Sequence, residues 1–271
     1  MRQLNGRIEL RGTGLHSGKE CNLTIEPYET CGVILSAKGE EYPLRELFAD
    51  GTRRGSDYIF PSGERIRTCE HIFSSLAGLG IYSGIRITVE GGEMPALDGC
   101  SRLISSEILR KSYNDGTPEK SCAIRDAIMV KSEDGKRFVC VYPSEEFRIT
   151  YTVEYPYIGV QTYDYTVTTD YVKEIAPART FALKRDIENL HSNGMALGGT
   201  LENAILIDEG GTEANGGLRF EDEIVRHKVL DVIGDMYSIG RAIRAHIICM
   251  RAGHELHLRL ADKLKGVMID G

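Results

Sequence analysis

The spacing of apolar residues in the first half of the chain switches between the period of a strand and that of a helix. Side chains alternate between apolar and polar where we predict strands, and recur every three or four positions where we predict helices. The predicted strands are 7–10, 21–25 and 84–90, and the predicted helices are 69–79 and 101–112. Thr68 is the expected N-cap of the first helix, and Gly80 is expected to end it.

A polar stretch rich in turn formers, 113–120, separates this half from a second one. The second half has predicted strands at 127–130, 137–142, 147–153, 163–167, 204–207 and 245–250, and predicted helices at 184–192 and 221–238. We therefore expect an N-terminal domain at 1–116 and a C-terminal domain at 117–271, with only a short tail after His254.

Two segments that precede a strand resemble each other. His71 and His227 each stand seven residues before a glycine, and each segment continues through Tyr-Ser into a predicted strand. Chance similarity is one explanation. The other is a duplicated unit of sheet and helix, which would bring the two histidine-bearing helices together at a pseudo-twofold interface, where sites are common.

Composition and charge exclude several classes of protein. The chain has 41% hydrophobic and 27% charged residues, which is typical of a globular protein, and its net charge of −7 disfavours nucleic acid as a partner. The seven cysteines include no C-x-x-C pair, so neither a disulfide framework nor a zinc ribbon is expected. Without a signal peptide or a spanning segment, we expect a cytoplasmic monomer with at most transient contact with a membrane surface.

The predicted helix 221–238 carries a polar line on an otherwise apolar surface. His227, Asp231 and Asp235 stand four residues apart and so lie on one side of the helix. Buried charge is unfavourable unless it is paired or bound to a metal. Two interpretations remain open: a His–Asp hydrogen bond inside a domain interface, or a metal site, because an imidazole and a carboxylate at i and i+4 can clamp zinc.

A catalytic zinc site usually has three protein ligands, so a second element must contribute. The adjacent pair Glu70 and His71 is the best complement, because one side chain can bind the metal while the other reaches the attacking water. Taken alone, Glu70 is explained better as a carboxylate favoured by the helix dipole. His254, on a glycine turn after the last predicted strand, can reach a shared site. The other histidines are expected to be structural or exposed: His16, His191, His246 and His257.

Together these and other motifs resemble the UDP-3-O-acyl-N-acetylglucosamine deacetylase family of lipid A biosynthesis over nearly the whole chain. The motifs that carry the resemblance are 12–19 (GTGLHSGK), 68–71 (TCEH), 76–81 (LAGLGI), 98–99 (DG), 178–181 (ARTF), 197–199 (LGG), 217–223 (GLRFEDE), 226–235 (RHKVLDVIGD) and 252–254 (AGH). The resemblance implies an α+β fold of two duplicated domains, with helices sandwiched between two sheets. It also implies a zinc-dependent hydrolase that removes acetate from a UDP-linked acyl-glucosamine, the committed step toward lipid A.

The same resemblance assigns roles to individual residues. The implied zinc ligands are His71, His227 and Asp231. The implied catalytic residues are Glu70 as general base, His254 as the cationic partner that protonates the leaving amine or stabilises charge, Asp235 as the residue that orients His254, and Thr180 at the oxyanion. The implied substrate-binding residues are Lys228, Phe181, Asp186, Leu197 and Gly198. Residues 182–211 are expected to hold the acyl chain, with a plain surface subdomain as the alternative.

The chain departs from the family around Arg137 and Tyr155, so nucleotide contacts by these two residues are only a hypothesis. Two further functions stay open: a zinc amidohydrolase acting on another acylated amino sugar, and a non-catalytic, metal-stabilised binding protein. Glu70, Thr180 and His254 favour an enzyme, because a scaffold does not need that set of groups.

Overall fold

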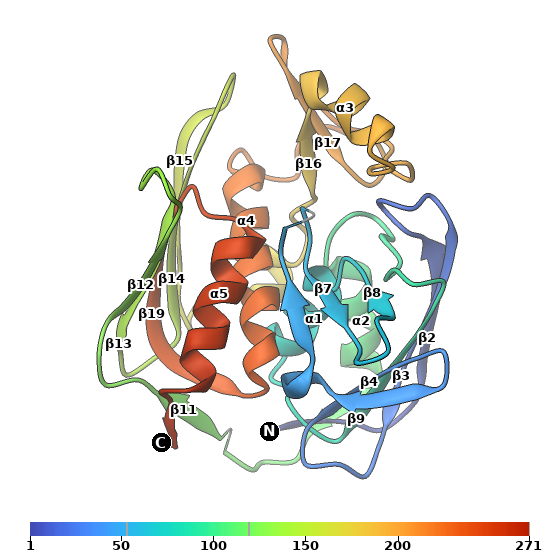
Figure 1. The fold of residues 1–271 in the computed structure, drawn as a ribbon, viewed down its shortest axis with the longest axis vertical. Helices are drawn as coiled ribbons and strands as arrows, with labels where there is room; N and C mark the ends of the chain where they lie inside the picture. The colour runs from blue at the N-terminus through green and yellow to red at the C-terminus, as the bar shows by residue number, and fades with distance from the viewer. Residues whose placement is uncertain (53, 119, 271) are drawn as a thin grey trace.

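Helices lie between two main sheets in the computed structural model, which describes residues 1–52, 54–118 and 120–270 (Figure 1). The first sheet has the order β2 (Ile8–Thr13), β3 (Glu20–Pro27), β9 (Ile85–Glu90), β4 (Val33–Ala37) and β5 (Glu40–Pro43). The second has the order β12 (Ile128–Lys131), β13 (Phe138–Pro143), β19 (Ala242–Met250), β14 (Arg148–Tyr155) and β15 (Gly159–Tyr165), and is extended by β11 (Ser121–Ala123) and β20 (Ile269–Asp270). The α+β prediction is confirmed.

The two sheets share one topology. In the first, β9 is antiparallel to β3 and parallel to β4, with β2 and β5 pairing antiparallel outside them. In the second, β19 is antiparallel to β13 and parallel to β14, with β12 and β15 in the outer positions. A helix precedes and another follows the central strand in each half. This repeated arrangement supports duplication over chance as the origin of the sequence similarity.

The helices fill the space between the sheets (Figure 1). The main helices are α1 (Glu70–Gly78), α2 (Arg102–Arg110), α4 (Glu223–Met236) and α5 (His254–Lys265), and the shorter turns are η1 (Leu44–Glu46), η2 (Tyr171–Ile175) and η4 (Tyr237–Ile239). Within α4 every residue except Arg226 is buried, since the helix packs against α1, α5 and the second sheet. No helix of residues 1–52, 54–118 and 120–270 has the length and apolar character to cross a membrane.

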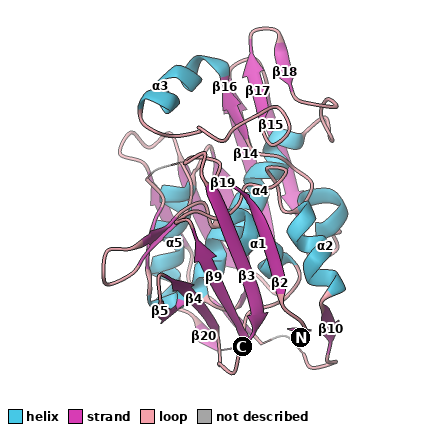
Figure 2. Cartoon of the chain, turned by 90° about the vertical axis from the view of Figure 1, so that its right-hand side faces the viewer, coloured by secondary structure: helices cyan, strands magenta, loops and turns pink. Residues whose placement is uncertain are grey.

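Three smaller sheets complete the fold. They are β1 (Arg2–Leu4) with β10 (Ser112–Asn114), then β6 (Phe48–Asp50) with β7 (Asp57–Ile59) and β8 (Arg65–Ile66), and finally β16 (Phe181–Leu183) with β17 (Ile205–Asp208) and β18 (Gly211–Glu213). Between β16 and β17 the chain forms η3 (Lys184–Asp186) and α3 (Ile187–Ser192). Figure 2 shows α3 and β16–β18 as a separate layer above the first sheet. We call this layer, residues 181–213, the cap.

Three predictions from the sequence were wrong in part. The chain after His254 is the long helix α5, not a short tail. The polar stretch 113–120 is not wholly a linker, because Ser112–Asn114 pairs with the N-terminal strand β1. Thr68 is not the N-cap of α1, which begins after Cys69, and Thr68 itself has a left-handed φ of 57°.

Candidate active site

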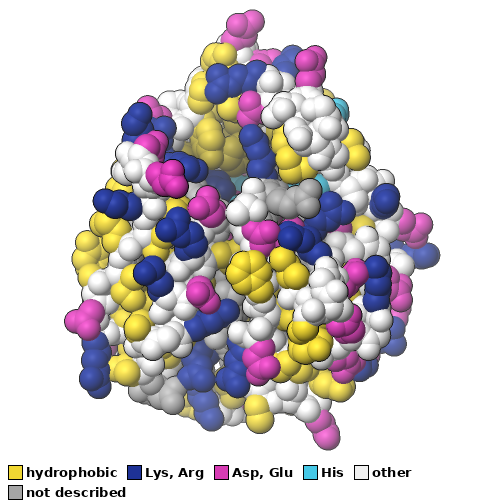
Figure 3. Space-filling view, in the orientation of Figure 1, with side chains coloured by type: hydrophobic (Ala, Val, Ile, Leu, Met, Phe, Trp, Pro, Cys, Tyr) yellow, Lys and Arg dark blue, Asp and Glu magenta, His cyan; other side chains and the backbone are white. Residues whose placement is uncertain are grey.

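A cavity of about 640 Å³ lies between the cap, the start of α4 and the turn that contains His16. Figure 3 shows its opening as a hollow below the cap, with hydrophobic side chains on the upper wall. Its apolar lining includes Leu15, Phe181, Leu183, Ile187, Leu190 and Leu206. Its polar lining includes Glu70, Thr180, His227, Lys228, Asp231 and His254. An apolar hollow with convergent polar groups is typical of a ligand site.

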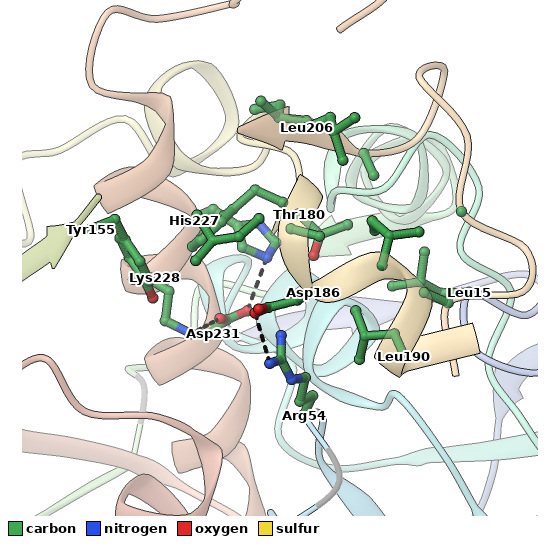
Figure 4. A pocket seen from close by; sticks show the side chains of 18 of the residues that line it. Leu15, Arg54, Tyr155, Thr180, Asp186, Leu190, Leu206, His227, Lys228 and Asp231 are labelled. Atoms are coloured by element: carbon green, nitrogen blue, oxygen red, sulfur yellow. Dashed lines mark hydrogen bonds and ion pairs between the residues drawn. The ribbon is translucent and has the colours of Figure 1, made fainter. Parts of the chain in front are cut away.

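Three buried side chains could hold a metal ion, and two of them, His227 and Asp231, line the cavity. His71 comes from α1, and His227 and Asp231 come from α4; one ligand atom of each lies within 4.8 Å of the others. The i, i+4 spacing places the two α4 residues on the same side of the helix, with His227 Nε2 3.3 Å from Asp231 Oδ1 (Figure 4). The sequence-predicted ligand set is therefore brought together in one place.

Gly234 explains how α1 and α4 approach closely enough for this. A Cβ added to Gly234 would lie 2.0 Å from the carbonyl oxygen of Glu70, closer than atoms can approach. Without a side chain at Gly234, the imidazole rings of His71 and His227 reach a centroid separation of 5.0 Å. A single glycine thus sets the spacing of the two halves of the site.

The protonation states of these three residues suit a metal. Burial lowers the pKa of His71 to about 3 and also lowers that of His227, so both imidazoles are neutral near pH 7. His227 donates from Nδ1 to the carbonyl oxygen of Ala178 at 3.0 Å, which leaves Nε2 with its lone pair. Burial opposes ionisation of Asp231, yet His227 and Lys228 hold its pKa well below the usual range. Asp231 Oδ1 is buried and accepts no hydrogen bond among the described residues.

Glu70 and His254 form an acid–base pair beside this group. Glu70 begins α1 and is 3% exposed, and burial raises its pKa to about 7. His254 begins α5; burial alone would lower its pKa, but Asp235 and Asp231 raise it to about 9. His254 Nε2 lies 4.0 Å from Glu70 Oε1, and its Nδ1 lies 3.0 Å from Asp235 Oδ2. Near neutral pH the pair offers a carboxylate close to its titration point and a protonated imidazole.

Comparisons with known proteins identify a family and several relatives that cover nearly the whole chain. The family model for UDP-3-O-acyl N-acetylglycosamine deacetylase matches residues 1–266. The chain belongs to this family. Three proteins named UDP-3-O-acyl-N-acetylglucosamine deacetylase are similar: from Syntrophotalea carbinolica (35% identity, 96% of this chain, 86% of the relative), Myxococcus xanthus (37%, 97% and 85%) and Idiomarina loihiensis (33%, 97% and 89%).

In this member of the deacetylase family, Glu93 holds the backbone just before Glu70. Its carboxylate accepts hydrogen bonds from the backbone N–H groups of His16 and Ser17, at 2.7 and 2.8 Å, and from Thr68 Oγ1 at 3.0 Å. A left-handed φ is strained for a β-branched residue such as Thr68. The buried Glu93 therefore holds Thr68 in the conformation from which α1 starts at Glu70. Because the Thr68 hydroxyl donates its hydrogen bond to Glu93, it does not cap the helix.

A buried ion pair between Arg179 and Glu223 positions the neighbouring Thr180 at the cavity. Arg179 donates from Nε to Glu223 Oε1 at 2.9 Å, and the two side chains are 2% and 0% exposed. The Thr180 N–H donates to the carbonyl oxygen of Gly99 at 2.8 Å, and the Thr180 side chain faces the cavity (Figure 4). The 98–99, 178–181 and 217–223 motifs thus form one scaffold under Thr180.

The residues predicted to bind substrate are only partly gathered here. Lys228 lines the cavity and donates to Asp231 Oδ2 at 2.6 Å, and the Phe181 ring lies 6.0 Å from that of His227. Asp186 and Arg54 both line the cavity and form an ion pair at 3.1 Å (Figure 4). Leu197 and Gly198 are not among the lining residues; their backbone N–H groups instead bond to the carbonyl oxygens of His16 and Leu15.

Arg137 and Tyr155, for which nucleotide contacts were a hypothesis, both line the cavity, together with Arg251. These three residues place two cations and an aromatic ring in the same hollow.

Four residues at the site were not predicted. His16 and Arg54 line the cavity, while Ser56 and His257 bond to Asp235. His257 could have been found, since it follows His254 by three residues and would share a helix face with it once α5 is predicted. His16 lies in the 12–19 motif, which marked the turn but not its place at the site, while Arg54 and Ser56 reach the site only through tertiary packing, which no local pattern reveals.

Proposed function

We propose that this chain hydrolyses the acetamide of a UDP-linked, 3-O-acylated N-acetylglucosamine, releasing acetate and the free amine on the path to lipid A. Family membership supports the substrate, since the relatives carry this activity in their names. The observation that carries the chemistry is the meeting of a metal-capable triad with the Glu70–His254 pair in one cavity.

The triad His71, His227 and Asp231 would hold zinc. Two neutral imidazoles and a carboxylate are a common ligand set of catalytic zinc, and the unsatisfied Asp231 Oδ1 is the kind of buried atom that a cation would satisfy. Bound there, zinc would act as a Lewis acid that polarises the substrate carbonyl and acidifies the attacking water.

The protein groups would then move the protons. Glu70 would accept the proton of the attacking water at Oε1, while its Oε2 stays bonded to the Ser56 N–H at 2.8 Å. The developing oxyanion would accept a hydrogen bond from the Thr180 hydroxyl. Protonated His254 would donate from Nε2 to the departing nitrogen as the C–N bond breaks, with Asp235 holding its Nδ1. Each such acid or base typically contributes about 10²–10⁴-fold in rate.

The two ends of the cavity fit the two ends of the substrate. The apolar wall formed by Leu183, Ile187, Leu190 and Leu206 of the cap would hold the acyl chain. Arg137, Tyr155 and Arg251 would receive the nucleotide, with cations for the diphosphate and a ring for the base. This local positive charge is compatible with the net charge of −7.

Metal analysis followed by an acetate-release assay tests the proposal. We expect about one zinc per chain and turnover of the UDP-linked substrate. Zinc without turnover of this substrate would point to a different acylated amino sugar. Absence of hydrolysis with any acylated amino sugar would leave only a metal-stabilised binding protein.

Replacement of Glu70 by glutamine separates metal binding from proton transfer. Glu70→Gln keeps the size of the side chain and an oxygen for the Ser56 N–H, but removes the base. We expect the zinc content to stay unchanged and kcat to fall by about 10²–10⁴-fold. Glu90→Gln, the same change at an exposed position in β9, should leave both unchanged. Full activity of Glu70→Gln would contradict the mechanism.

A further inference from the structure

Ser56 bonds to the acid–base machinery through three atoms. It lies just before β7 and is fully buried. Its N–H donates to Glu70 Oε2 at 2.8 Å, its carbonyl oxygen accepts from the Cys69 N–H at 2.9 Å, and its hydroxyl donates to Asp235 Oδ1. One small residue of the first half therefore contacts the base, the residue before the base, and the carboxylate that supports the acid.

Asp235 has a donor on each oxygen besides His254. Ser56 Oγ bonds to Oδ1, and His257 Nδ1 bonds to Oδ2 at 2.7 Å, while His254 Nδ1 lies 3.0 Å from Oδ2. Rotation of the Asp235 carboxylate would break the bonds to Ser56 and His257 together. Ser56 and His257 thus orient the Asp235 carboxylate without His254. Asp235 in turn orients the His254 ring through the contact with its Nδ1.

We propose that Ser56 is a positioning residue of the deacetylation, one that fixes Glu70 and the Asp235–His254 pair relative to each other across the two halves of the chain. This inference rests on the proposed function. Ser56 does not line the cavity, so it acts through Glu70, Asp235 and His254, whose Nδ1 lies 3.4 Å from Ser56 Oγ. The distance it controls is the 4.0 Å between Glu70 Oε1 and His254 Nε2. Water deprotonation and amine protonation occur at one amide, and a misplacement of about 1 Å can cost about 10²-fold in rate.

The variant Ser56→Ala isolates the hydroxyl, because both backbone bonds of Ser56 remain. We expect kcat of the zinc-loaded enzyme to fall by roughly 10–100-fold, with KM changed less than about twofold and the zinc content unchanged. Ser56→Thr, which restores a hydroxyl, should recover most of kcat. A crystal structure of Ser56→Ala should show a changed separation of Glu70 Oε1 and His254 Nε2.

A matched control is Ser105→Ala on α2. Ser105 is also fully buried, and within the part of the chain that the structure describes its hydroxyl bonds only to Ser75 Oγ, at 3.2 Å. Loss of that hydroxyl should lower stability to a similar extent as Ser56→Ala and leave kcat unchanged. Equal losses of kcat in the two variants would mean that Ser56 has a general structural role, and would overturn the proposal.

A double-mutant cycle keeps the test decisive if Ser56→Thr does not fold. In an Asp235→Ala background the acceptor of the Ser56 hydroxyl is gone, so Ser56→Ala should cost less than about twofold further. Fully additive losses, a raised KM with unchanged kcat, or loss of zinc would each overturn the proposal. An inactive wild-type enzyme would instead refute the proposed function, which makes the two failures distinguishable.

Discussion

Arg179 shows how much a single buried charge can matter. Its guanidinium donates to both oxygens of Glu223 and to the carbonyl oxygens of Asn215 and Gly217. Burial would raise the pKa of Glu223, but the hydrogen bonds from Arg179 hold it below its usual range. Glu223 therefore stays ionised in the interior, where a charge without its partner is unfavourable.

Replacement of Arg179 by methionine should lower the free energy of unfolding by about 3–5 kcal/mol, because Glu223 would remain buried and unpaired. Urea denaturation measures the loss. Lys38→Met is the contrast: Lys38 pairs with Glu64 at 2.8 Å but is 74% exposed, so its loss should cost less than about 1 kcal/mol. Equal losses in both variants would show that burial does not decide the strength of these pairs.

At the scale of elements, the contact between α1 and α4 at Gly234 decides whether the site can form. Helix propensity alone favours alanine over glycine inside α4 by about 1 kcal/mol. A steric clash acts against this preference at Gly234, because an added Cβ would lie 2.0 Å from the carbonyl oxygen of Glu70. Helix propensity predicts that Gly234→Ala raises the free energy of unfolding, and the steric conflict predicts that it lowers it. Measuring this variant therefore shows which effect is larger.

We expect Gly234→Ala to destabilise the protein by about 1–3 kcal/mol and to weaken metal binding, because α1 and α4 must separate. Thermal unfolding and metal titration would measure the two effects. Gly32→Ala, where an added Cβ meets nothing within 4 Å, should be nearly neutral. A stabilised Gly234→Ala variant would show that the close approach of the helices has little effect on the fold.

Elements with one clear period were predictable from the sequence, and those held by other forces were not. In β19 Ile243, Ala245, Ile247 and Cys249 alternate inward, so its strand pattern is visible. In α5, Leu256, Leu260 and Leu264 recur every four residues as a buried helical face, but Leu256, Leu258 and Leu260 are also spaced by two, which fits a strand, so the local period is ambiguous. The strand β10 is polar and exists through backbone bonds to β1, which leave no hydrophobic signature.

The same distinction applies to the site. The His227–Asp231–Asp235 line is a local helix pattern, so its grouping was open to prediction. Thr68 misled the N-cap rule because its hydroxyl bonds to Glu93, which is distant in sequence. Ser56 reaches Asp235 across 179 positions, and nothing in the residues around Ser56 indicates this contact.

At the scale of the whole molecule, the proposed metal would join the two halves. His71 belongs to the first half, while His227 and Asp231 belong to the second, and each half has its own hydrophobic core. A ligand that binds only the assembled site stabilises the folded state, by about 4 kcal/mol at a concentration 1,000 times its Kd.

Removal of the metal with a chelator should therefore lower the melting temperature, by about 2–4 °C for each kcal/mol of lost binding free energy. Differential scanning calorimetry with and without chelator measures the shift. Asp231→Asn, which weakens the ligand set, should melt lower and respond less to chelator. An unchanged melting temperature of the wild type after complete metal removal would contradict a bridging metal.

The duplicated topology has a consequence for how the site came to be asymmetric. His71 and His227 occupy equivalent places in the two units, yet their neighbours differ: Glu70 precedes the first and Arg226 the second, while Ser75 and Asp231 follow four residues on. A homodimer of the first unit would offer two bases and no carboxylate ligand. A homodimer of the second would offer two carboxylate ligands and no base. A single chain that carries both units offers one base and one carboxylate ligand at the same site.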